Sequence, residues 1–384
     1  MAMRKGSPLH PVLYLKRNLS KTGPLVGVII LAVMLIAGIV SMINSIPLSI
    51  KTIYSYSKHY LGLTPRGDAS LTPVFRKEIE EKSPVAIDRI TVVRGSFIEV
   101  RSIVGGWPFA VMAMSQEDMR YYSQRLGVTA VDGRYPEIGE PAVIVSEPMA
   151  KNLKLKIGST LLGPELTEAY SPNEVKVVGI AKTDEWLALA SIEYYQVNHF
   201  PPVDSLLVFA KNREDQSTLD HWADEEFKGE RAQLYSYHKL EEQADTMFSI
   251  LYQILNVVIG TQVVVVTLMM GMLINIYLSQ RIQEFGLLQA LGHTKRSILG
   301  RVLKETGLVV IGGWILGVFV AYSLLQVVKS QLMDPQAFAL NPLDHMAYIY
   351  TIPIPVAIFL VAFLTVSHRF RKFDPVGVVE RRLI

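Results

Sequence analysis

The stretch MFSILYQILNVVIGTQVVVVTLMMGMLINIYL, residues 247–278, decides the fold of this chain of 384 residues. It contains no Asp, Glu, Lys or Arg. A helix needs about 20 consecutive apolar residues to cross the roughly 30 Å hydrocarbon core of a bilayer. The charge-free run extends from Thr246 to Gln280, which as one helix would measure about 50 Å. We therefore predict a transmembrane helix that continues beyond the bilayer as a stalk.

Three further stretches without Asp, Glu, Lys or Arg are predicted to span the membrane: 24–46, 307–328 and 346–367. The first follows a basic region, as a cleaved signal peptide would. Its apolar run exceeds the length of a signal core, and no A-x-A cleavage site follows it. We interpret it as a retained anchor whose helix continues past Pro47 as a second stalk.

The distribution of Lys and Arg predicts the orientation. Basic residues gather in 1–23, in 279–305 and in the C-terminal tail from Arg369 onward. Short basic loops stay in the cytoplasm. We therefore predict a multi-pass protein of the cytoplasmic (inner) membrane, with both termini and the 279–305 loop inside.

The predicted fold is a membrane protein with four transmembrane α-helices and a large extracytoplasmic α/β domain inserted between helices 1 and 2. The expected boundaries are, in chain order, 1–23 (cytoplasmic amphipathic helix), 24–46 (span one), 47–245 (extracytoplasmic domain with stalk helices), 246–280 (span two), 281–305 (cytoplasmic coupling loop), 306–329 (span three), 330–345 (short outer loop), 346–368 (span four) and 369–384 (cytoplasmic tail).

The outer insert has alternating apolar residues and helix caps in several places. The chain has no cysteine, so the insert must fold on its own apolar core. The expected elements are strands in 87–106, 173–183 and 203–212, a helix at 115–127, a strand–helix–turn–strand unit in 139–163 and a polar helix at 212–227.

Nothing in the sequence predicts catalysis. The insert has no H-E-x-x-H metal spacing and no G-x-S-x-G elbow, and the chain has no G-x-x-x-x-G-K-[ST] loop for a nucleotide. We therefore expect a non-catalytic protein that binds no cofactor of its own.

The aromatic run YSYSKHY, residues 54–60, allows two interpretations. It could touch lipid headgroups or a lipophilic ligand. We favour the simpler one, in which a helix continues out of span one with its tyrosines at the membrane interface.

The loop QRIQEFGLLQALGHTKRSILGRVLKE, residues 280–305, resolves into two short amphipathic helices. Gly292 ends the first, whose apolar stripe is Ile282, Phe285, Leu288 and Leu291; the stripe of the second is Ile298, Leu299, Val302 and Leu303. Both helices are basic. They can lie on the membrane surface or present an edge to a cytoplasmic partner.

This loop resembles the signature loop of FtsX-like ABC permeases. The matching residues are Arg281, Glu284, Phe285, Gly286, Leu287, Leu288, Ala290, Leu291, Gly292, Thr294 and Ile298, whereas Gln289 and His293 depart from the family pattern. The tail FDPVGVVERR is similar to the close of the family, with Gly377 in place of Glu. LHPVLYLKRNLSK before span one and the stretch from Asp132 to Leu161 are similar to MacB-like permeases.

The resemblance implies a dimer with eight spans and a separate ABC ATPase subunit that binds ATP and Mg. The coupling loop would dock on that ATPase through Arg281, Glu284, Phe285, Gly286, Leu291, Gly292, Lys295 and Arg296. The alternative is that these residues only cap and anchor span three.

Two functions are compatible with the resemblance. The first is a MacB-like permease that exports or extracts a lipophilic or envelope substrate, such as a lipid, lipoprotein, peptide or drug. The alternative is an FtsX-type mechanotransmission complex that activates a cell-wall hydrolase and transports nothing. Expected partners are the ATPase, a second permease copy or paralogue, membrane lipids and, as a further candidate, a periplasmic adaptor; no nucleic acid is expected.

Overall fold

A computed structural model describes residues 17–167, 169–198 and 203–371. Most of the predicted N-terminal helix and the tail after Arg371 lie outside the described residues. The chain divides into two compact units. The helical unit is formed by residues up to Ile43, Ile250–Lys329 and residues from Asn341 onward, and the sheet unit by Asn44–Ser249 and Ser330–Leu340.

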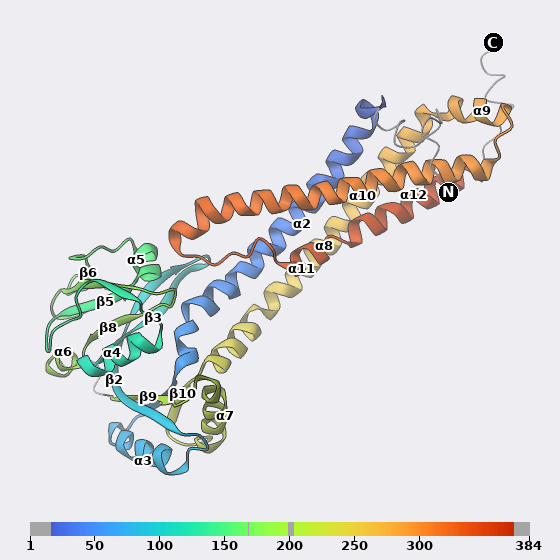
Figure 1. Ribbon diagram of the computed structural model, residues 1–384. Coiled ribbons are helices and arrows are strands. Elements are labelled where there is room, and N and C mark those ends of the chain that lie inside the picture. Colours follow the sequence, from blue (N-terminus) through green and yellow to red (C-terminus); the bar gives the residue numbers. More distant parts are fainter. Residues whose placement is uncertain (1–16, 168, 199–202, 372–384) are drawn as a thin grey trace. The chain divides into compact units, whose positions relative to one another are not determined.

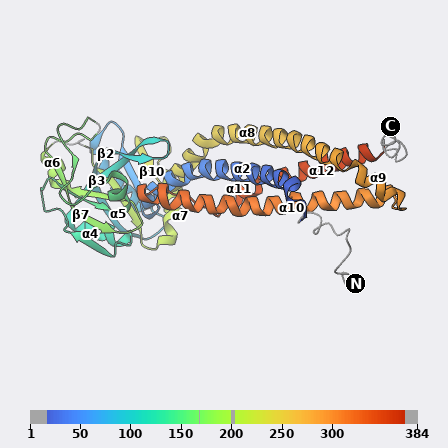
Figure 2. The same cartoon turned by 90° about the horizontal axis from the view of Figure 1, so that it is seen from above.

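The helices that build the helical unit are α2 (Leu19–Ile53), α8 (Tyr237–Gln280), α9 (Ile282–Ala290), α10 (Lys295–Val328), α11 (His345–Ile349) and α12 (Pro353–Arg371). Four helical segments are long and apolar enough to cross a membrane, which confirms the four predicted spans. Figures 1 and 2 show α2, α8, α10 and α12 running alongside one another. Helix α8 is unbroken over 44 residues, as the charge-free run predicted.

Helices α2 and α10 approach each other closely because small residues lie between them. A Cβ added to Gly313 would stand 3.2 Å from the Ile29 side chain, and one added to Gly317 would stand 2.8 Å from Cβ of Val33. Small residues four apart let helix backbones come together where lipid is as apolar as the protein. The G-x-x-x-G spacing of α10 therefore fixes a helix contact.

The fourth span differs from the single helix predicted over 346–367. Its first turn is the short helix α11, and after Tyr350–Ile352 the chain starts again as α12. Pro353 and Pro355 lack a backbone N–H, and proline is tolerated in the first turn of a helix but not in its interior. The Trp314 indole of α10 donates a 2.9 Å hydrogen bond to the Thr351 hydroxyl and thereby braces the break.

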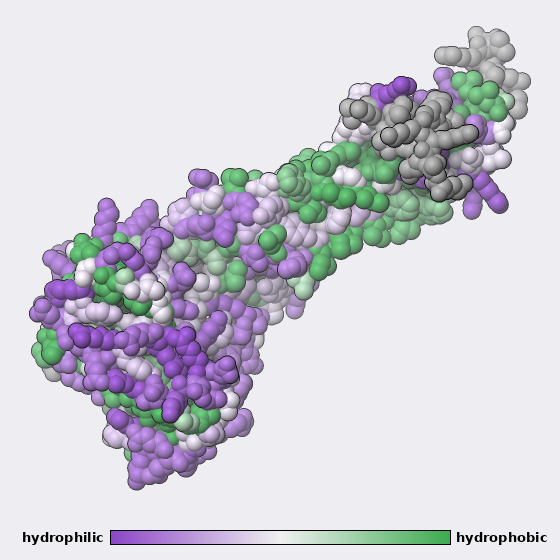
Figure 3. All heavy atoms as spheres, viewed as in Figure 1, coloured by the Kyte–Doolittle hydropathy of each residue, from purple (hydrophilic) through white to green (hydrophobic). Residues whose placement is uncertain are grey.

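Apolar side chains cover much of the outer surface of the helical unit. On α8 alone Ile250, Val257, Leu268 and Met272 are each more than half exposed, and Figure 3 shows the helices as largely hydrophobic. Such a surface is stable in lipid but not in water. This supports the assignment of the unit to the membrane.

The sheet unit is built on ten strands: β1 (Leu61–Pro65), β2 (Ile87–Ser102), β3 (Gly105–Met114), β4 (Ala130–Gly133), β5 (Ala142–Ser146), β6 (Thr160–Leu162), β7 (Val175–Lys182), β8 (Ala188–Ser191), β9 (Ser205–Ala210) and β10 (Ala232–Tyr235). Their order is β10-β1-β9-β2-β3-β8-β5-β7-β4, with β6 beside β7. Strand β2 is 16 residues long and pairs with β9 through its first half and with β3 through its second. It thus joins two halves of one sheet (Figure 1).

Five helices belong to this sheet: α3 (Thr72–Lys82), α4 (Gln116–Arg125), α5 (Glu147–Leu153), α6 (Ile192–Val197) and α7 (Gln216–Glu226). The predicted elements are confirmed, including the serine cap, since Ser115 Oγ accepts a hydrogen bond from Asp118 N. Helices α3 and α7 cover one face of the β10–β1–β9 half through a core of Leu63, Phe75, Ile79, Val208 and Leu219. The sequence did not predict β1, β4, β8, β10, α3, α6 or most of β3.

Residues 330–340, which lie between spans three and four, fold as part of the sheet unit. Ser49 Oγ donates to Ala339 O at 3.2 Å and accepts from Ala339 N at 3.1 Å, and Asn152 Nδ2 donates to Gln336 O at 2.8 Å. The outer loop and the 47–245 insert therefore lie on the same side of the membrane, as four spans require.

The interface interpretation of the run Tyr54–Tyr60 is wrong. After α2 the chain forms a 3-10 turn, η1 (Ser55–His59), and enters β1. Tyr56 and Tyr60 are 4% and 6% exposed and lie edge-on to Phe109 and Phe209 of the sheet. Burial in a protein core, rather than a membrane interface, accounts for these aromatic residues.

Candidate functional site

The predicted coupling loop is a helix–turn–helix formed by α9, residues Leu291–Thr294 and the start of α10. Gly292 has φ +92°, a conformation that glycine adopts without strain. With Gly292 in this conformation, Gly292 N donates to Gln289 O and His293 N to Leu288 O, which caps α9. Thr294 then caps α10, since its hydroxyl accepts from Ser297 N at 3.3 Å. The LGHT sequence therefore encodes a sharp reversal between two helices.

Arg281 lies at the base of this reversal and is 2% exposed. Its Nη1 donates to Oε2 of Glu305 at 2.6 Å and to the Tyr277 hydroxyl at 2.7 Å, while Nε donates to Oε2 of Glu284 at 3.0 Å. Glu305 is 1% exposed and its other oxygen accepts from Arg301 Nε at 3.0 Å. Removing one partner of such a buried pair costs about 3–5 kcal/mol. The network therefore ties α9 to both α8 and α10.

An apolar contact with α12 also holds α9 in place. Phe285 is 4% exposed and its ring lies 5.3 Å from that of Phe370 on α12. Gly286, beside it, is also buried. In the second helix Ile298 and Val302 are buried in the same cluster, as their spacing predicted.

The opposite face of the reversal is exposed. Leu287 is 64% exposed and Leu291 79%, and Gly292, Lys295 and Arg296 are exposed beside them. Two apolar side chains and two cations thus gather at the tip of a helical hairpin.

The structure divides the eight predicted docking residues into two groups. Arg281, Phe285 and Gly286 lie inside the helical unit, where they position the hairpin and cannot touch a partner in this arrangement. Glu284 is half-exposed and bound to Arg281. Leu291, Gly292, Lys295 and Arg296 lie on the surface, and their docking role stays a prediction.

The sequence analysis missed the partners of Arg281. Glu305 and Tyr277 lie 24 and 4 residues away along the chain. Arg301 and Glu305 stand four residues apart in α10, and this spacing places them on one helix face. The signal for this network in the sequence was Glu305, a carboxylate at the membrane boundary next to the long apolar run 307–328.

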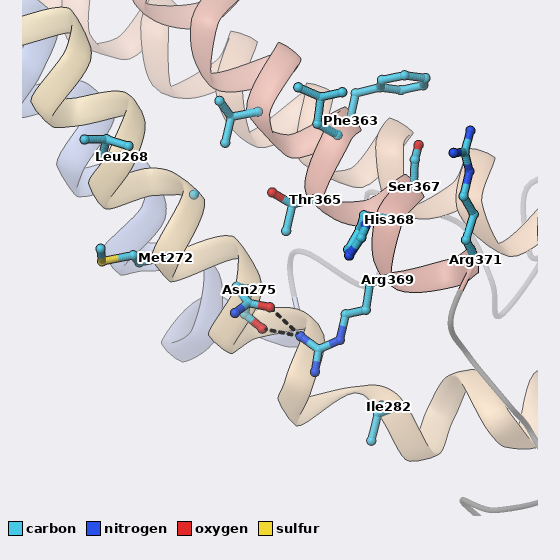
Figure 4. Close-up of a pocket in the computed structure, with 13 residues that line it drawn as sticks. Leu268, Met272, Asn275, Ile282, Phe363, Thr365, Ser367, His368, Arg369 and Arg371 are labelled. Carbon is cyan, nitrogen blue, oxygen red and sulfur yellow. Dashed lines mark hydrogen bonds between the residues drawn. The ribbon is translucent and has the colours of Figure 1, made fainter.

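An open groove of about 1030 Å³ lies between α8 and α12 next to this hairpin. Figure 4 shows Leu268 and Met272 on one wall and Thr365 and His368 on the other, with Arg369 reaching across to Asn275. Arg369 Nη1 donates to the Asn275 side chain at 2.6 Å and to its backbone carbonyl at 2.9 Å. The groove is apolar toward the spans and cationic toward Arg371, as expected of a lipid-facing crevice at the membrane boundary.

Among the residues that the structure describes, no group of three or more His, Cys, Asp or Glu side chains is placed to hold a metal ion. The tip of the described hairpin carries cations and apolar side chains.

Comparison with known proteins finds a family match in the C-terminal part of the chain. Residues 256–375, which contain α9 and the Arg281 network, match the FtsX-like permease C-terminal family. No curated protein matches the chain.

Three solved structures are similar over about half of the chain. The periplasmic region of MacB from Actinobacillus actinomycetemcomitans is 10% identical, covers 49% of this chain and 92% of its own, and has a TM-score of 0.29. The extracellular domain of the ABC-type transporter YknZ from Gram-positive bacteria is 12% identical over 46% of this chain and 100% of its own, with a TM-score of 0.25. A domain of a permease protein from Porphyromonas gingivalis is 10% identical over 47% and 91%, with a TM-score of 0.24.

Proposed function

We propose that this chain, whose residues 256–375 match the FtsX-like permease C-terminal family, is the membrane subunit of an ABC transporter driven by a separate ATPase. The ATPase docks on the exposed tip of the α9–α10 hairpin, and ATP and Mg bind to that partner. One observation supports this most strongly. The base of the hairpin is held by the buried ion pairs of Arg281 and Glu305, whereas its tip exposes the apolar side chains of Leu287 and Leu291.

The base makes the hairpin a rigid element. The buried ion pairs of Arg281 and Glu305 bind α9 to α8 and α10, so α9 cannot be displaced without moving the helices that carry it. A movement imposed on the tip would therefore be passed to the membrane spans. Helix α8 is continuous from Tyr237 to Gln280, which carries the same movement toward residues of the sheet unit.

The tip supplies the contact. Leu287 and Leu291 offer apolar area, and Lys295 and Arg296 flank it with positive charge. Burying one leucine side chain contributes about 1.5–3 kcal/mol. The complementary surface on the ATPase would be a groove with an apolar floor and acidic rims.

We further propose that the working unit contains a second permease chain, a copy or a paralogue, and that the substrate is lipophilic. Transport and hydrolase activation would both use the same hairpin, so the third protein in the complex distinguishes them: a periplasmic adaptor indicates export and a cell-wall hydrolase indicates mechanotransmission.

The test is affinity purification of the full chain from native membranes in mild detergent, with the co-purified ABC ATPase quantified by mass spectrometry. Leu291→Asp places a charge at the centre of the proposed contact and should reduce the recovered ATPase at least tenfold, or about 1.4 kcal/mol of binding. The matched control is Leu343→Asp, since Leu343 is 61% exposed in the loop before α11; its recovery should equal that of wild type. Full ATPase recovery with Leu291→Asp would contradict the docking site, and no ATPase with the wild-type chain would contradict the proposed function.

A further inference from the structure

A cavity of about 670 Å³ lies within the sheet unit, on the face of the sheet opposite to α3 and α7. Its floor is formed by alternate residues of four neighbouring strands: Gly62 and Thr64 of β1, Ser205 and Leu207 of β9, Val93, Gly95 and Phe97 of β2, and Pro108, Ala110 and Met112 of β3. Side chains at alternate positions share one face of a sheet. Strand pairing agrees, since Gly62 stands opposite Leu207, Gly95 opposite Met112 and Phe97 opposite Ala110.

The cavity is also lined by the aromatic segment around the turn η1 and by the first turn of α8. Tyr54, Tyr56 and Tyr60 line it, together with Tyr235 and Leu240. Its size lies within the roughly 300–1,000 Å³ that is usual for small-molecule sites. The exposed rings of Phe97 (64%), Tyr170 (61%) and Tyr235 (40%) are also in the lining and form an accessible rim.

None of the described residues that line the cavity is charged. An ionised ligand would therefore find no counter-charge there, and burying an unpaired charge is strongly unfavourable. The lining favours a neutral molecule with a large apolar part.

Two tyrosine hydroxyls of the lining have no hydrogen bond to a described residue. The Tyr54 hydroxyl donates to Pro108 O, Ser96 and Tyr195 share a 2.6 Å hydrogen bond, and Thr64 and Ser205 share one of 2.7 Å. In contrast, Tyr56 and Tyr60, 4% and 6% exposed, have no side-chain hydrogen bond to any described residue. Burial raises the pKa of both phenols, so each keeps a proton to donate. A hydroxyl in a cavity lining that has no partner in the protein can hydrogen-bond a molecule in the cavity.

We propose that this cavity binds a neutral lipophilic molecule, with a hydrocarbon or aromatic body and one uncharged hydrogen-bonding group that pairs with Tyr56 and Tyr60. The binding site rests on the sheet unit alone. Its interpretation as the substrate site of a permease rests on the proposed function above.

Gly95 allows the cavity to be filled selectively. A Cβ built at Gly95 meets no atom within 4 Å, so Gly95→Leu should place its side chain in the cavity without a backbone clash. The matched control is Gly312→Leu in α10, where a Cβ also meets nothing within 4 Å. A second variant, Tyr56→Phe with Tyr60→Phe, removes both hydroxyls and keeps the rings.

The experiment is photolabelling of the full chain in lipid nanodiscs, without ATP or ATPase, with a long-chain alcohol that carries a diazirine. Labelled peptides are mapped by mass spectrometry. Peptides from α8 and α12 report contact with lipid in every sample. We expect saturable labelling of peptides covering 51–65 and 92–112 in wild type and in Gly312→Leu, and at least a tenfold loss in Gly95→Leu. The double phenylalanine variant should need about tenfold more alcohol, because two hydrogen bonds of roughly 0.5–1 kcal/mol each are lost.

A diazirine fatty acid of equal length, charged at neutral pH, should label the helices but not the cavity. Wild-type labelling confined to the helices, or cavity labelling that persists in a folded Gly95→Leu chain, would refute the proposal. Should Gly95→Leu fail to fold, an unchanged response of the double phenylalanine variant to the alcohol would refute it instead. Leu291→Asp should label the cavity normally, so a failed ATPase interaction and a failed ligand site are distinguished.

Discussion

The Arg281 network of the helical unit and the tyrosines beside the sheet-unit cavity differ in how their polar groups are paired. In the helical unit Arg281 and Glu305 are almost fully buried, yet each oxygen of Glu305 and two nitrogens of Arg281 make hydrogen bonds of 3.0 Å or less. In the sheet unit Tyr56 and Tyr60 are buried beside a cavity, and neither hydroxyl has a partner among the described residues.

The difference distinguishes polar groups that stabilise the fold from polar groups that can bind a ligand. A buried polar group that is fully paired stabilises one arrangement, because any other leaves it unpaired. A hydroxyl in a cavity lining that has no partner in the protein can instead pair with a ligand. The surfaces are reversed as well: apolar side chains face outward on the helices, and the sheet unit is largely hydrophilic (Figure 3).

The largest effect is expected from breaking the paired network. Arg281→Met leaves Glu305 buried without its main counter-charge and should lower the free energy of unfolding by about 3–5 kcal/mol. Adding Glu305→Gln to the same chain should recover most of this loss. Unfolding of both variants in detergent micelles measures it. A loss below about 1 kcal/mol in the single variant would mean that the hairpin base is not held as described.

A buried carboxyl in α7 tests the sheet unit by pH. Burial and the nearby Asp224 raise the pKa of Asp220 to about 7, against a hydrogen bond from Gln216 that lowers it. Between about pH 4 and 7 the folded state then holds a proton that the unfolded state has lost, so stability decreases as the pH rises. From pH 4 to 8 the loss should be on the order of 3 kcal/mol.

Asp220→Asn should abolish this pH dependence and stabilise the sheet unit at pH 8, whereas Asp184→Asn at an exposed site should leave it intact. Hydrogen exchange of α7 in the full chain at several pH values is the measurement. Stability that is constant from pH 4 to 8 in wild type would contradict the assignment.

The close contact between α2 and α10 should make stability sensitive to any side chain added at Gly317. Gly317→Leu forces its side chain into Val33 and the backbone of Ile30, which should cost about 1–3 kcal/mol. Gly312→Leu on the same helix meets open space and should have little effect. Thermal unfolding in detergent compares the two. Equal midpoints would show that α2 and α10 are not in close contact.

The smallest effect is expected at the hairpin turn. Thr294→Ala removes the cap of α10 and should destabilise its first turn by about 1 kcal/mol, which hydrogen exchange over residues 295–300 would detect. Thr294→Ser keeps the hydroxyl and should behave as wild type. Because this turn presents the proposed docking tip, faster exchange without weaker ATPase recovery would show that docking does not need a preformed turn.

The sequence by itself determined the features that depend on local pattern. Charge-free runs predicted the four spans, because only a long apolar helix satisfies its backbone in lipid. The spacing around Leu291 and Gly292 predicted the hairpin, because its cap and turn depend on neighbouring residues. Alternation and capping predicted most of the outer elements, including the helix that begins after Ser115.

Only the tertiary structure decided which of those residues are accessible. Arg281 looked like a docking residue until Glu305, 24 residues away, proved to be its buried partner. The tyrosines of 54–60 looked interfacial until the strands β1, β2, β3 and β9 came together beneath them and left a cavity. Pairings between distant segments create both features, and no local pattern records a partner that is far away in the chain.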